Sequence, residues 1–461
     1  MKEKYLNIIT KTISIVYLLF IIYLLITNIY HFNIFNILGI IISIILIYLI
    51  TKLKIEKKVF FIMLLIVVLS RIYLLFLDYK NILGDYSFFY GSSISLSKNL
   101  ELNNSYIALF PYLYSYIFIL GNIMKIIGIK YISVIITNLL FEIIGGIFFY
   151  LLMKRIDKFD EKKCILIYIY NPFNIIWITI CSPVIITNTF FIICIYIFYI
   201  LKDTKKTTKK IILSILLGMF LAIANSFRPI IIIFLIALLI YIIFTYLKTK
   251  KVNKYSIASI FICLFIYVLT TFSINAYIAK KIDVKTISSK SGWSLYVGAN
   301  YEEKGMWNQE DSNYLTKIYK SNNHIETQNI LKKEAINRYK KLNIKTIPLL
   351  VYKSILLTND VEIYSYDSYN SLRNNEITDI LKIAIKISLA TYMYYILITN
   401  LIIIIKNIKN KKETLLFPTG IYAIGLFVAS LLVEISPRYF MPITIPLMIY
   451  STQLLKKEEQ K

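Results

Sequence analysis

The sequence predicts an all-α, multi-pass membrane protein, and three observations favour this fold class. Hydrophobic residues make up 58% of the 461 positions, charged residues only 17%, and the mean hydropathy is +0.66, which is too apolar for a soluble domain of this length. Apolar runs of about 17–25 residues recur along the chain, and a helix of that length crosses about 30 Å of hydrocarbon. The alternating ten-residue pattern of a membrane β-barrel does not occur.

The basic residues indicate which loops face the cytoplasm. A net charge of +26 in a soluble protein would suggest a nucleic-acid partner, but here the lysines gather in short loops between apolar runs. We therefore expect a lipid bilayer as the environment, no nucleic acid, and both termini on the cytoplasmic side of the membrane. The basic segments are 52–58, 154–163, 202–210, 248–254, 406–412 and the tail from Lys456.

These loops require an odd number of crossings between residues 78 and 153, where two apolar segments lie. We assign 131–153 as the span and 106–128 as a helix along the outer surface, because the second segment contains Pro111, Gly121 and Lys125. About twelve spans result: 12–30, 33–50, 59–77, 131–153, 164–181, 183–201, 211–226, 229–247, 255–277, 379–405, 414–433 and 439–455.

The predicted spans divide the chain into three parts. Residues 1–277 form a transmembrane domain with a first outer loop at 78–130, and residues 379–461 form the C-terminal transmembrane helices. Between them, residues 278–378 form an extracytoplasmic loop domain, with an expected helix near 325–343. Within that loop the apolar piece 347–357 is too short to span the membrane.

Several kinds of chemistry are not indicated. The four cysteines occur singly, without a CxxC pair, so neither a disulfide framework nor a zinc site is expected. With only two histidines, a Ser-His-Asp triad is not expected either. The first apolar run is long and lacks a small-residue cleavage site, so it is predicted to be a retained span. No internal repeat of the kind common in secondary transporters is found.

Three polar positions fall on the predicted outer side. Asp85, in Gly84-Asp85-Tyr86, is either a helix-capping aspartate or a general base that takes a proton from an acceptor hydroxyl. Arg228, before Pro229, either snorkels at a helix end or holds a phosphate. Arg438 either pairs locally with Glu434 or stabilises a phosphate that gains charge as its glycosidic bond breaks.

Other polar and aromatic residues have weaker signals. Arg71 and Glu142 lie within predicted spans, where ionisable groups are normally paired, so we expect them to be structural partners. Lys353 is a further candidate for binding a phosphate. Trp293 and Trp307 are candidates for stacking on a sugar ring, together with Tyr301, although aromatic residues are also common at membrane interfaces.

Taken together, these motifs resemble the GT-C superfamily of integral-membrane glycosyltransferases, and in particular glycosyltransferase family 39 with its protein O-mannosyltransferases and aminoarabinose transferases. The motifs that carry the resemblance are Asp85-Tyr86 with Tyr90, Phe110-Pro111-Tyr112-Leu113-Tyr114 before Leu120-Gly121, Phe227-Arg228-Pro229, Val297-Gly298-Ala299-Asn300-Tyr301, Gly305-Met306-Trp307-Asn308, and Glu434 with Arg438-Tyr439. The chain departs from several relatives at Tyr86, where they have a second acid, and at Phe110, where they have a lysine.

The resemblance implies a GT-C-like fold and an inverting hexosyltransferase that uses a polyprenyl-phosphate sugar, such as a mannose donor, at the outer membrane face. Asp85 would be the base, Arg228 and Arg438 would lie near the donor phosphate, and the binding residues would include Glu434, Tyr86 and Tyr439. The acceptor is a glycan, a protein or a lipid. No cofactor is implied with certainty, and the need for a divalent metal ion stays open.

Two alternatives remain. A transporter or flippase of lipid-linked sugars also needs outer cations and aromatic residues, but it would place its polar groups near the middle of the membrane beside broken helices. A polysaccharide-assembly subunit could share the scaffold and lack catalysis. The grouping of the polar residues on the outer side favours the enzyme.

Overall fold

The structure is a computed structural model that describes residues 2–30, 33–76, 84–102, 104–156, 160–249, 254–287, 292–359, 376–410 and 418–455. Every regular element in these ranges is helical, which confirms the predicted all-helical architecture. Eight of the described helices are long and apolar enough to cross a membrane: α1 (Lys2–Ile29), α2 (Ile34–Lys52), α3 (Lys57–Leu75), α7 (Ile132–Arg155), α10 (Val184–Asp203), α11 (Thr207–Phe227), α13 (Lys254–Lys281) and α19 (Glu376–Lys409). The chain is therefore a multi-pass membrane protein by length and composition of its helices.

Shorter helices complete the fold. Three of them are apolar: α6 (Tyr112–Ile127), α12 (Ile232–Thr249) and α20 (Thr419–Leu432). The others are α4 (Gly84–Ser97), α5 (Asn104–Leu109), α8 (Glu161–Ile169), α9 (Pro172–Ile178), α14 (Gly292–Gly298), α15 (Gln309–Ser321), α16 (His324–Leu342), η1 (Asn343–Lys345), α17 (Thr346–Asn359), η2 (Pro437–Phe440), α21 (Met441–Ser451) and η3 (Thr452–Leu455).

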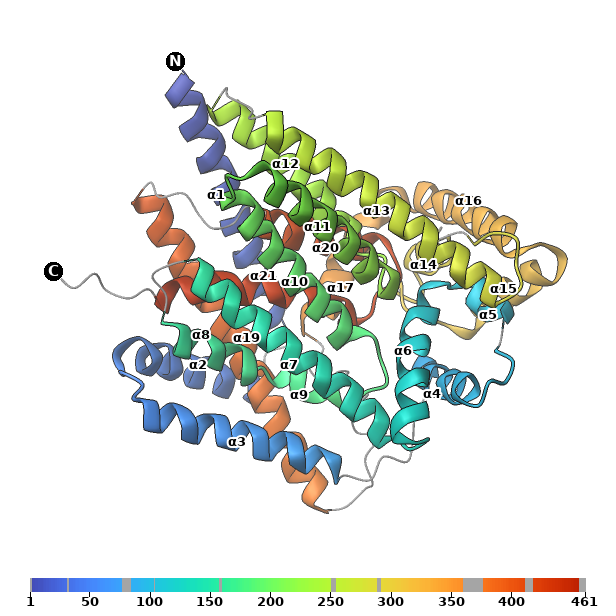
Figure 1. The fold of residues 1–461 in the computed structure, drawn as a ribbon, viewed down its shortest axis with the longest axis horizontal. Helices are drawn as coiled ribbons and strands as arrows, with labels where there is room; N and C mark the ends of the chain where they lie inside the picture. Colours follow the sequence, from blue (N-terminus) through green and yellow to red (C-terminus); the bar gives the residue numbers. More distant parts are fainter. Residues whose placement is uncertain are drawn as a thin grey trace.

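Five of the short helices lie apart from most of the long helices. In Figure 1, α1 begins and η3 ends at the left of the molecule, where α2 also turns into α3. Helices α4, α5, α14, α15 and α16 gather at the opposite end. Helices α4 and α5 of the predicted first outer loop therefore lie beside α14, α15 and α16 of the predicted loop domain. All five lie away from both ends of the described chain.

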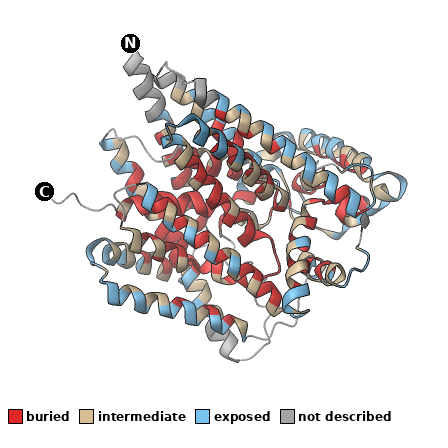
Figure 2. Ribbon diagram, in the orientation of Figure 1, coloured by how far each residue is buried: buried red, intermediate tan, exposed pale blue. Residues whose placement is uncertain are grey.

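The core lies in the middle of the long helices, as the red segments in Figure 2 show. In α10, 78% of its apolar 18-residue stretch is buried, whereas the corresponding stretches of α3 and α13 are only 11% and 17% buried. The exposed side chains of α3 and α13 are nevertheless large and apolar, for example Phe61, Phe265 and Phe272. A contiguous apolar exterior of this kind fits a surface in contact with lipid rather than water.

Some of the twelve predicted spans differ in the structure. The segment 164–181 is broken into α8 and α9, because Pro172 cannot continue α8 and the backbone N–H of Phe173 donates to the Asn171 side chain, which caps α9. The segment 439–455 is divided among η2, α21 and η3, and 414–433 reduces to the 14-residue α20, with residues 414–417 outside the described residues. Twelve full-length spans therefore stay a prediction.

The expected helices of the outer loops are present. The helix near 325–343 is α16, and the short apolar piece 347–357 is α17. The segment 106–128 forms α5 and α6, which are separated at Phe110 and Pro111. Proline lacks a backbone N–H, so it starts a new helix here rather than extending the previous one.

The predicted partnership of Arg71 and Glu142 is confirmed. Arg71 Nη2 lies 2.8 Å from Glu142 Oε1, and the same nitrogen donates to the carbonyl oxygen of Ile169 at 2.6 Å. On the other side, the hydroxyl of Tyr168 donates to the Glu142 carbonyl oxygen at 3.1 Å. The pair thus ties α3 and α7 to the end of α8, where the helix breaks.

A second ion pair holds the outer helices together. Arg338 of α16 donates to Asp311 of α15 at 2.8 Å, and its guanidinium lies 3.5 Å from the centre of the Tyr296 ring in α14. Burial acts to raise the pKa of Asp311, but hydrogen bonds from Arg338, Asn300 and Asn308 outweigh it, so this pKa is lowered. α14 is consequently fixed against α15 and α16.

Candidate functional site

A cavity of about 560 Å³ lies where α4, α6, α11, α13, α14, α20 and η2 converge. Its lining includes Asp85, Arg228 and Arg438, which are far apart in the sequence. Trp293 and Tyr439 line it as well. The structure therefore brings the three principal candidate residues to one cavity, and their chemical roles stay predictions.

Asp85 stands in the first turn of α4, after Gly84, whose φ of +57° lies in the left-handed region that glycine adopts without strain. Its Oδ2 accepts a hydrogen bond from Arg438 Nη2 at 2.9 Å, and 43% of its side chain is exposed. The N-terminal end of a helix favours a carboxylate. Asp85 therefore lies within the helix rather than before it, and its carboxylate is directed to an arginine of the cavity.

Arg438 lies in η2, and 20% of its side chain is exposed. The expected alternative was a local pair with Glu434, but the ion pair in the structure is with Asp85. Its Nε is buried without a hydrogen-bond partner, and its guanidinium carbon lies 5.6 Å from the centre of the Tyr439 ring. Arg438 thus donates from Nη2 to a carboxylate, while its Nε–H can still donate to a ligand.

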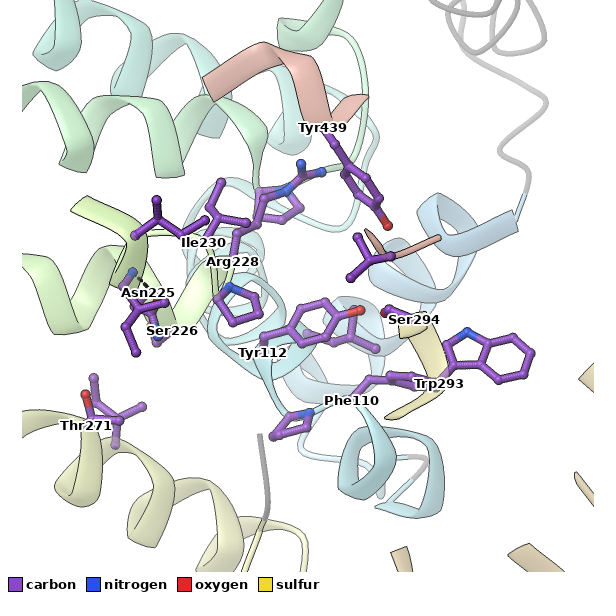
Figure 3. A pocket seen from close by; sticks show the side chains of 18 of the residues that line it. Phe110, Tyr112, Asn225, Ser226, Arg228, Ile230, Thr271, Trp293, Ser294 and Tyr439 are labelled. Carbon is purple, nitrogen blue, oxygen red and sulfur yellow. Dashed lines mark hydrogen bonds between the residues drawn. The ribbon is translucent and has the colours of Figure 1, made fainter. Parts of the chain in front are cut away.

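Arg228 is the C-cap of α11 and has an extended backbone before Pro229. Its side chain is buried, and Nη1 donates to the backbone carbonyl of Arg438 at 3.3 Å. No carboxylate of the described residues forms an ion pair with it. Figure 3 shows its guanidinium directed toward Tyr439. Burial, followed by the nearby Arg438 charge, lowers the pKa of Arg228.

A buried guanidinium without a counter-ion is costly unless an anion is available to compensate it. The cavity beside Arg228 supplies the space for such an anion. Arg228 and Arg438 together can bind a phosphate through charge-assisted hydrogen bonds. The arrangement thus has the charges and the space that binding of an anion requires, with a carboxylate among the lining residues.

The two ends of the cavity differ in their chemistry. Figure 3 shows Asn225, Ser226 and Thr271 on one side of Arg228, and Ser294 and Trp293 on the other. The start of α12 also lies at the first end, where the backbone N–H of Ile232 donates to the Asn225 side chain at 3.2 Å. The second end is mainly aromatic, with Phe110 and Tyr112 beside Trp293. A ligand with an apolar part and a polar, ring-containing part fits this division.

Four other predicted site residues do not line the cavity. The Tyr86 ring packs against that of Trp177 at 6.3 Å, and Trp307 is 55% exposed. Lys353 is fully buried, with its amine donating to two backbone carbonyls, so its position does not support phosphate binding. Glu434 is partly exposed; burial raises its pKa to about 7, with Arg438 and Lys353 opposing and Asp85 adding to the rise.

Gln328 lines the cavity, and no sequence pattern predicts it as a site residue. Its Oε1 accepts from the backbone N–H of Trp293 at 3.0 Å, and its Nε2 donates to the Leu109 carbonyl at 3.1 Å. Gln328 therefore fixes α14 relative to the end of α5. An amide in an amphipathic helix looks like any surface glutamine, so only the fold reveals its contacts.

Metal-ligand clusters are absent from the described part of the chain, where no three His, Cys, Asp or Glu side chains come together. Comparison of the chain with family models, curated proteins and solved structures finds no match. The helical, apolar architecture and the cavity are therefore the observations from which a function is inferred.

Proposed function

We propose that the protein is a glycosyltransferase that moves a hexose from a polyprenyl-phosphate sugar to an acceptor at the outer face of the membrane. The observation that carries this proposal is the shared cavity of Arg228, Arg438 and Asp85. The outer placement is supported by the basic loops, which favour a cytoplasmic location for the opposite ends of the helices. A bacterial plasma membrane is part of the proposal.

The charges of the three residues support a phosphodiester as the bound group. Two guanidiniums and one carboxylate leave one net positive charge, which matches the single negative charge of a polyprenyl-phosphate sugar. Arg228 has no carboxylate to displace among the described residues, so we assign it the first contact with the phosphate. Arg438 then shares its remaining donors between the phosphate and Asp85.

The proposed reaction is a single displacement. The acceptor oxygen attacks the anomeric carbon, the bond from that carbon to the phosphate oxygen breaks, and its electron pair stays on the phosphate. The acceptor proton passes to Asp85 Oδ2. The phosphate thereby gains a second negative charge as Asp85 becomes neutral, so the two arginines face a dianion, and this charge match stabilises the transition state.

The apolar lining of the cavity supports a path for the lipid chain. Ile232 and Ile233 of α12 and Ile274 of α13 are among the apolar residues that line the cavity. Helix α13 presents exposed apolar side chains such as Phe265 and Phe272 on its outer surface. We propose that the polyprenyl chain leaves the cavity between these two helices, while the sugar lies toward Tyr112 and Ser294.

Binding of farnesyl phosphate to the purified full-length protein tests the anion site without knowledge of the acceptor. We expect Arg228→Gln to weaken binding about 10–100-fold, because a charge-assisted hydrogen bond contributes roughly 1.5–3 kcal/mol. Arg155→Gln is the matched control, since Arg155 pairs with Asp203 at 3.1 Å and is 41% exposed. Equal affinity of Arg228→Gln and wild type, or no measurable binding by the wild type, would contradict the proposal.

A transporter of lipid-linked sugars is the second candidate, favoured by one observation. The break between α8 and α9 lies beside the buried Arg71–Glu142 pair, as in transporters with discontinuous helices. That pair is closed, however, and does not line the cavity. Proteoliposomes separate the candidates: a transporter moves the intact donor across the bilayer, whereas the enzyme releases polyprenyl phosphate when an acceptor is present.

A non-catalytic assembly subunit is the third candidate, and the same cavity would then only bind the lipid. This candidate requires binding of farnesyl phosphate without any transfer by the wild type in membranes that contain the native acceptor. Loss of transfer on substitution of Asp85 with retained binding would exclude it.

A further inference from the structure

Arg438 is carried by a short segment, residues 432–438, that links α20 to η2; we call it the arginine arm. Between Leu432, the last residue of α20, and Pro437 the arm has no regular structure, and contacts with the outer helices hold it. The backbone N–H of Glu434 donates to the Ser294 carbonyl at 2.6 Å, and that of Ile435 donates to the Gly305 carbonyl at 2.8 Å. The arm therefore runs along α14 and the loop that follows it.

Two side chains strengthen this contact from different helices. The hydroxyl of Tyr339 in α16 lies 3.1 Å from the Gly298 carbonyl oxygen and 2.8 Å from that of Leu432, and its single proton is shared between them. The amine of Lys353 in α17 donates to the carbonyls of Gly298 and Val433, at 2.9 and 2.6 Å. Each side chain thus bridges the end of α14 to the arginine arm.

The contact of Lys353 with the arginine arm depends on tight packing at two glycines, Gly298 and Gly305. A Cβ at Gly298 would collide with the backbone of Val433. A Cβ at Gly305 would lie 2.9 Å from Lys353 Cδ, and the φ of Gly305 is +75°. Glycine is needed at Gly305 because other residues are strained there and would push against the lysine. The lysine chain is therefore enclosed on several sides rather than resting on a surface.

We infer that Lys353 is a positioning residue, whose buried amine fixes the arginine arm and thereby holds Arg438 toward Asp85 and the cavity. This inference rests on the proposed function, because it concerns the geometry of the proposed phosphate site. Lys353 does not line the cavity and its amine is engaged by two carbonyls, so the role differs from that of a phosphate ligand.

The surroundings of Lys353 explain why a lysine suits this position. Burial lowers its pKa to about 7, and the nearby Glu434 charge partly offsets the effect. A neutral amine keeps two N–H donors, so both carbonyl contacts survive in either protonation state. An apolar side chain of the same length would leave the Gly298 and Val433 carbonyls with fewer partners in a buried site, which is costly.

The test measures affinity for farnesyl phosphate in full-length Lys353→Met, with Lys345→Met as the matched control. Lys345 belongs to the neighbouring η1 and is exposed. We expect Lys353→Met to weaken binding about 10-fold and Lys345→Met to leave it unchanged. Lys353→Gln, whose amide can donate to both carbonyls, should recover part of the lost affinity.

A double-mutant cycle with Arg438→Lys separates positioning from a general loss of folding. If Lys353 acts through Arg438, Lys353→Met should cost much less affinity in the Arg438→Lys background than in the wild type. If the affinity of the double variant falls by the product of the two single-variant losses, the two residues act independently and the inference is overturned. Should Lys353→Met fail to fold, the same cycle with Lys353→Gln decides the question by the same criterion.

The two proposals fail in different ways. If Arg228→Gln loses affinity while Lys353→Met binds as the wild type does, the positioning role is wrong and the phosphate site stands. If the wild type does not bind farnesyl phosphate, the proposed function is wrong, and the inference about Lys353 falls with it.

Discussion

Two arginine–carboxylate pairs of nearly equal length occupy different environments in this protein. Arg71 and Glu142 lie 2.8 Å apart with side chains 10% and 7% exposed, and Arg438 and Asp85 lie 2.9 Å apart with 20% and 43% exposed. Arg71 uses all three guanidinium nitrogens, whereas Arg438 has a buried Nε without a partner. The first pair is closed, and the second pair opens onto the cavity.

The difference determines whether a ligand can reach the charged groups of each pair. In a closed pair each charge has a fixed partner, so a ligand has no donor or acceptor to engage. In the open pair a bound phosphate can compete for Arg438 and release the carboxylate. The Arg338–Asp311 pair of the outer helices resembles the closed pair, because Asn300 and Asn308 also donate to Asp311.

The strongest test of the open pair is Asp85→Asn. The amide keeps the shape of the carboxylate but cannot act as a base toward the hydroxyl of the sugar acceptor. We therefore expect the rate of sugar transfer to fall about 1000-fold, equivalent to roughly 4 kcal/mol in activation free energy. Transfer is measured as release of polyprenyl phosphate in membranes that contain the native acceptor. Thermal stability should change little, because 43% of the Asp85 side chain is already exposed. Farnesyl phosphate affinity should not fall, because the carboxylate competes with the phosphate for Arg438.

Asp203→Asn controls for the loss of an exposed carboxylate, since Asp203 pairs with Arg155 far from the cavity. Its transfer activity should equal that of the wild type. Retention of full activity by Asp85→Asn would remove Asp85 from the role of base and leave the open pair without a catalytic function.

The closed pair should respond in stability rather than in binding. We expect Arg71→Met to destabilise the protein by roughly 3 kcal/mol, because it leaves Glu142 buried and unpaired. Thermal or denaturant unfolding in detergent measures this loss. The double variant Arg71→Met with Glu142→Met should recover much of the stability, since an apolar pair has no uncompensated charge.

Farnesyl phosphate affinity, measured per folded molecule, should stay within about twofold of the wild type in both variants. A selective loss of affinity in Arg71→Met would show that the closed pair takes part in ligand binding. That result would favour a transporter, in which buried charges of the spans belong to the substrate path.

The sequence predicted the helical membrane architecture because long apolar runs have few other stable structures. It also predicted that Arg71 and Glu142 are partners, since isolated charges within spans are costly. The break at Asn171–Pro172 had a signal, because asparagine before proline is a typical helix start, but the apolar run around it outweighed that signal.

The contacts of Lys353 could not be predicted from the sequence. Its partners are backbone carbonyls of Gly298 and Val433, and carbonyls carry no residue-specific signal. The pairing of Arg438 with Asp85 rather than with Glu434 was equally hidden, because a charge four residues away in the chain looks like the nearer partner. Long-range contacts of this kind depend on the packing of α14, α17 and the arginine arm.

The smallest expected effect concerns the pH dependence of stability around the open pair. Glu434, whose pKa in the folded protein is raised to about 7 from an ordinary 4.5, contributes stability that is fully present below pH 4.5 and is lost as the pH rises to about 7. Lys353 acts in the opposite direction. Its pKa is lowered to about 7 from 10.5, so the cost of burying its charge is present below pH 7 and is relieved as the pH rises toward 10.5.

Together, Glu434 and Lys353 should give a shallow minimum of thermal stability near pH 7, with a depth of about 2 °C for a protein of this size. Glu434→Gln should remove the decline below pH 7 and keep the rise above it, whereas Lys353→Gln should do the reverse. Unfolding scans from pH 4.5 to 10 in one detergent would measure both limbs. If both variants showed the same dependence of thermal stability on pH as the wild type, neither group would be held in the surroundings that the arginine arm provides. The contrast with the closed pair would then rest on the open hydrogen-bonding capacity of Arg438 alone.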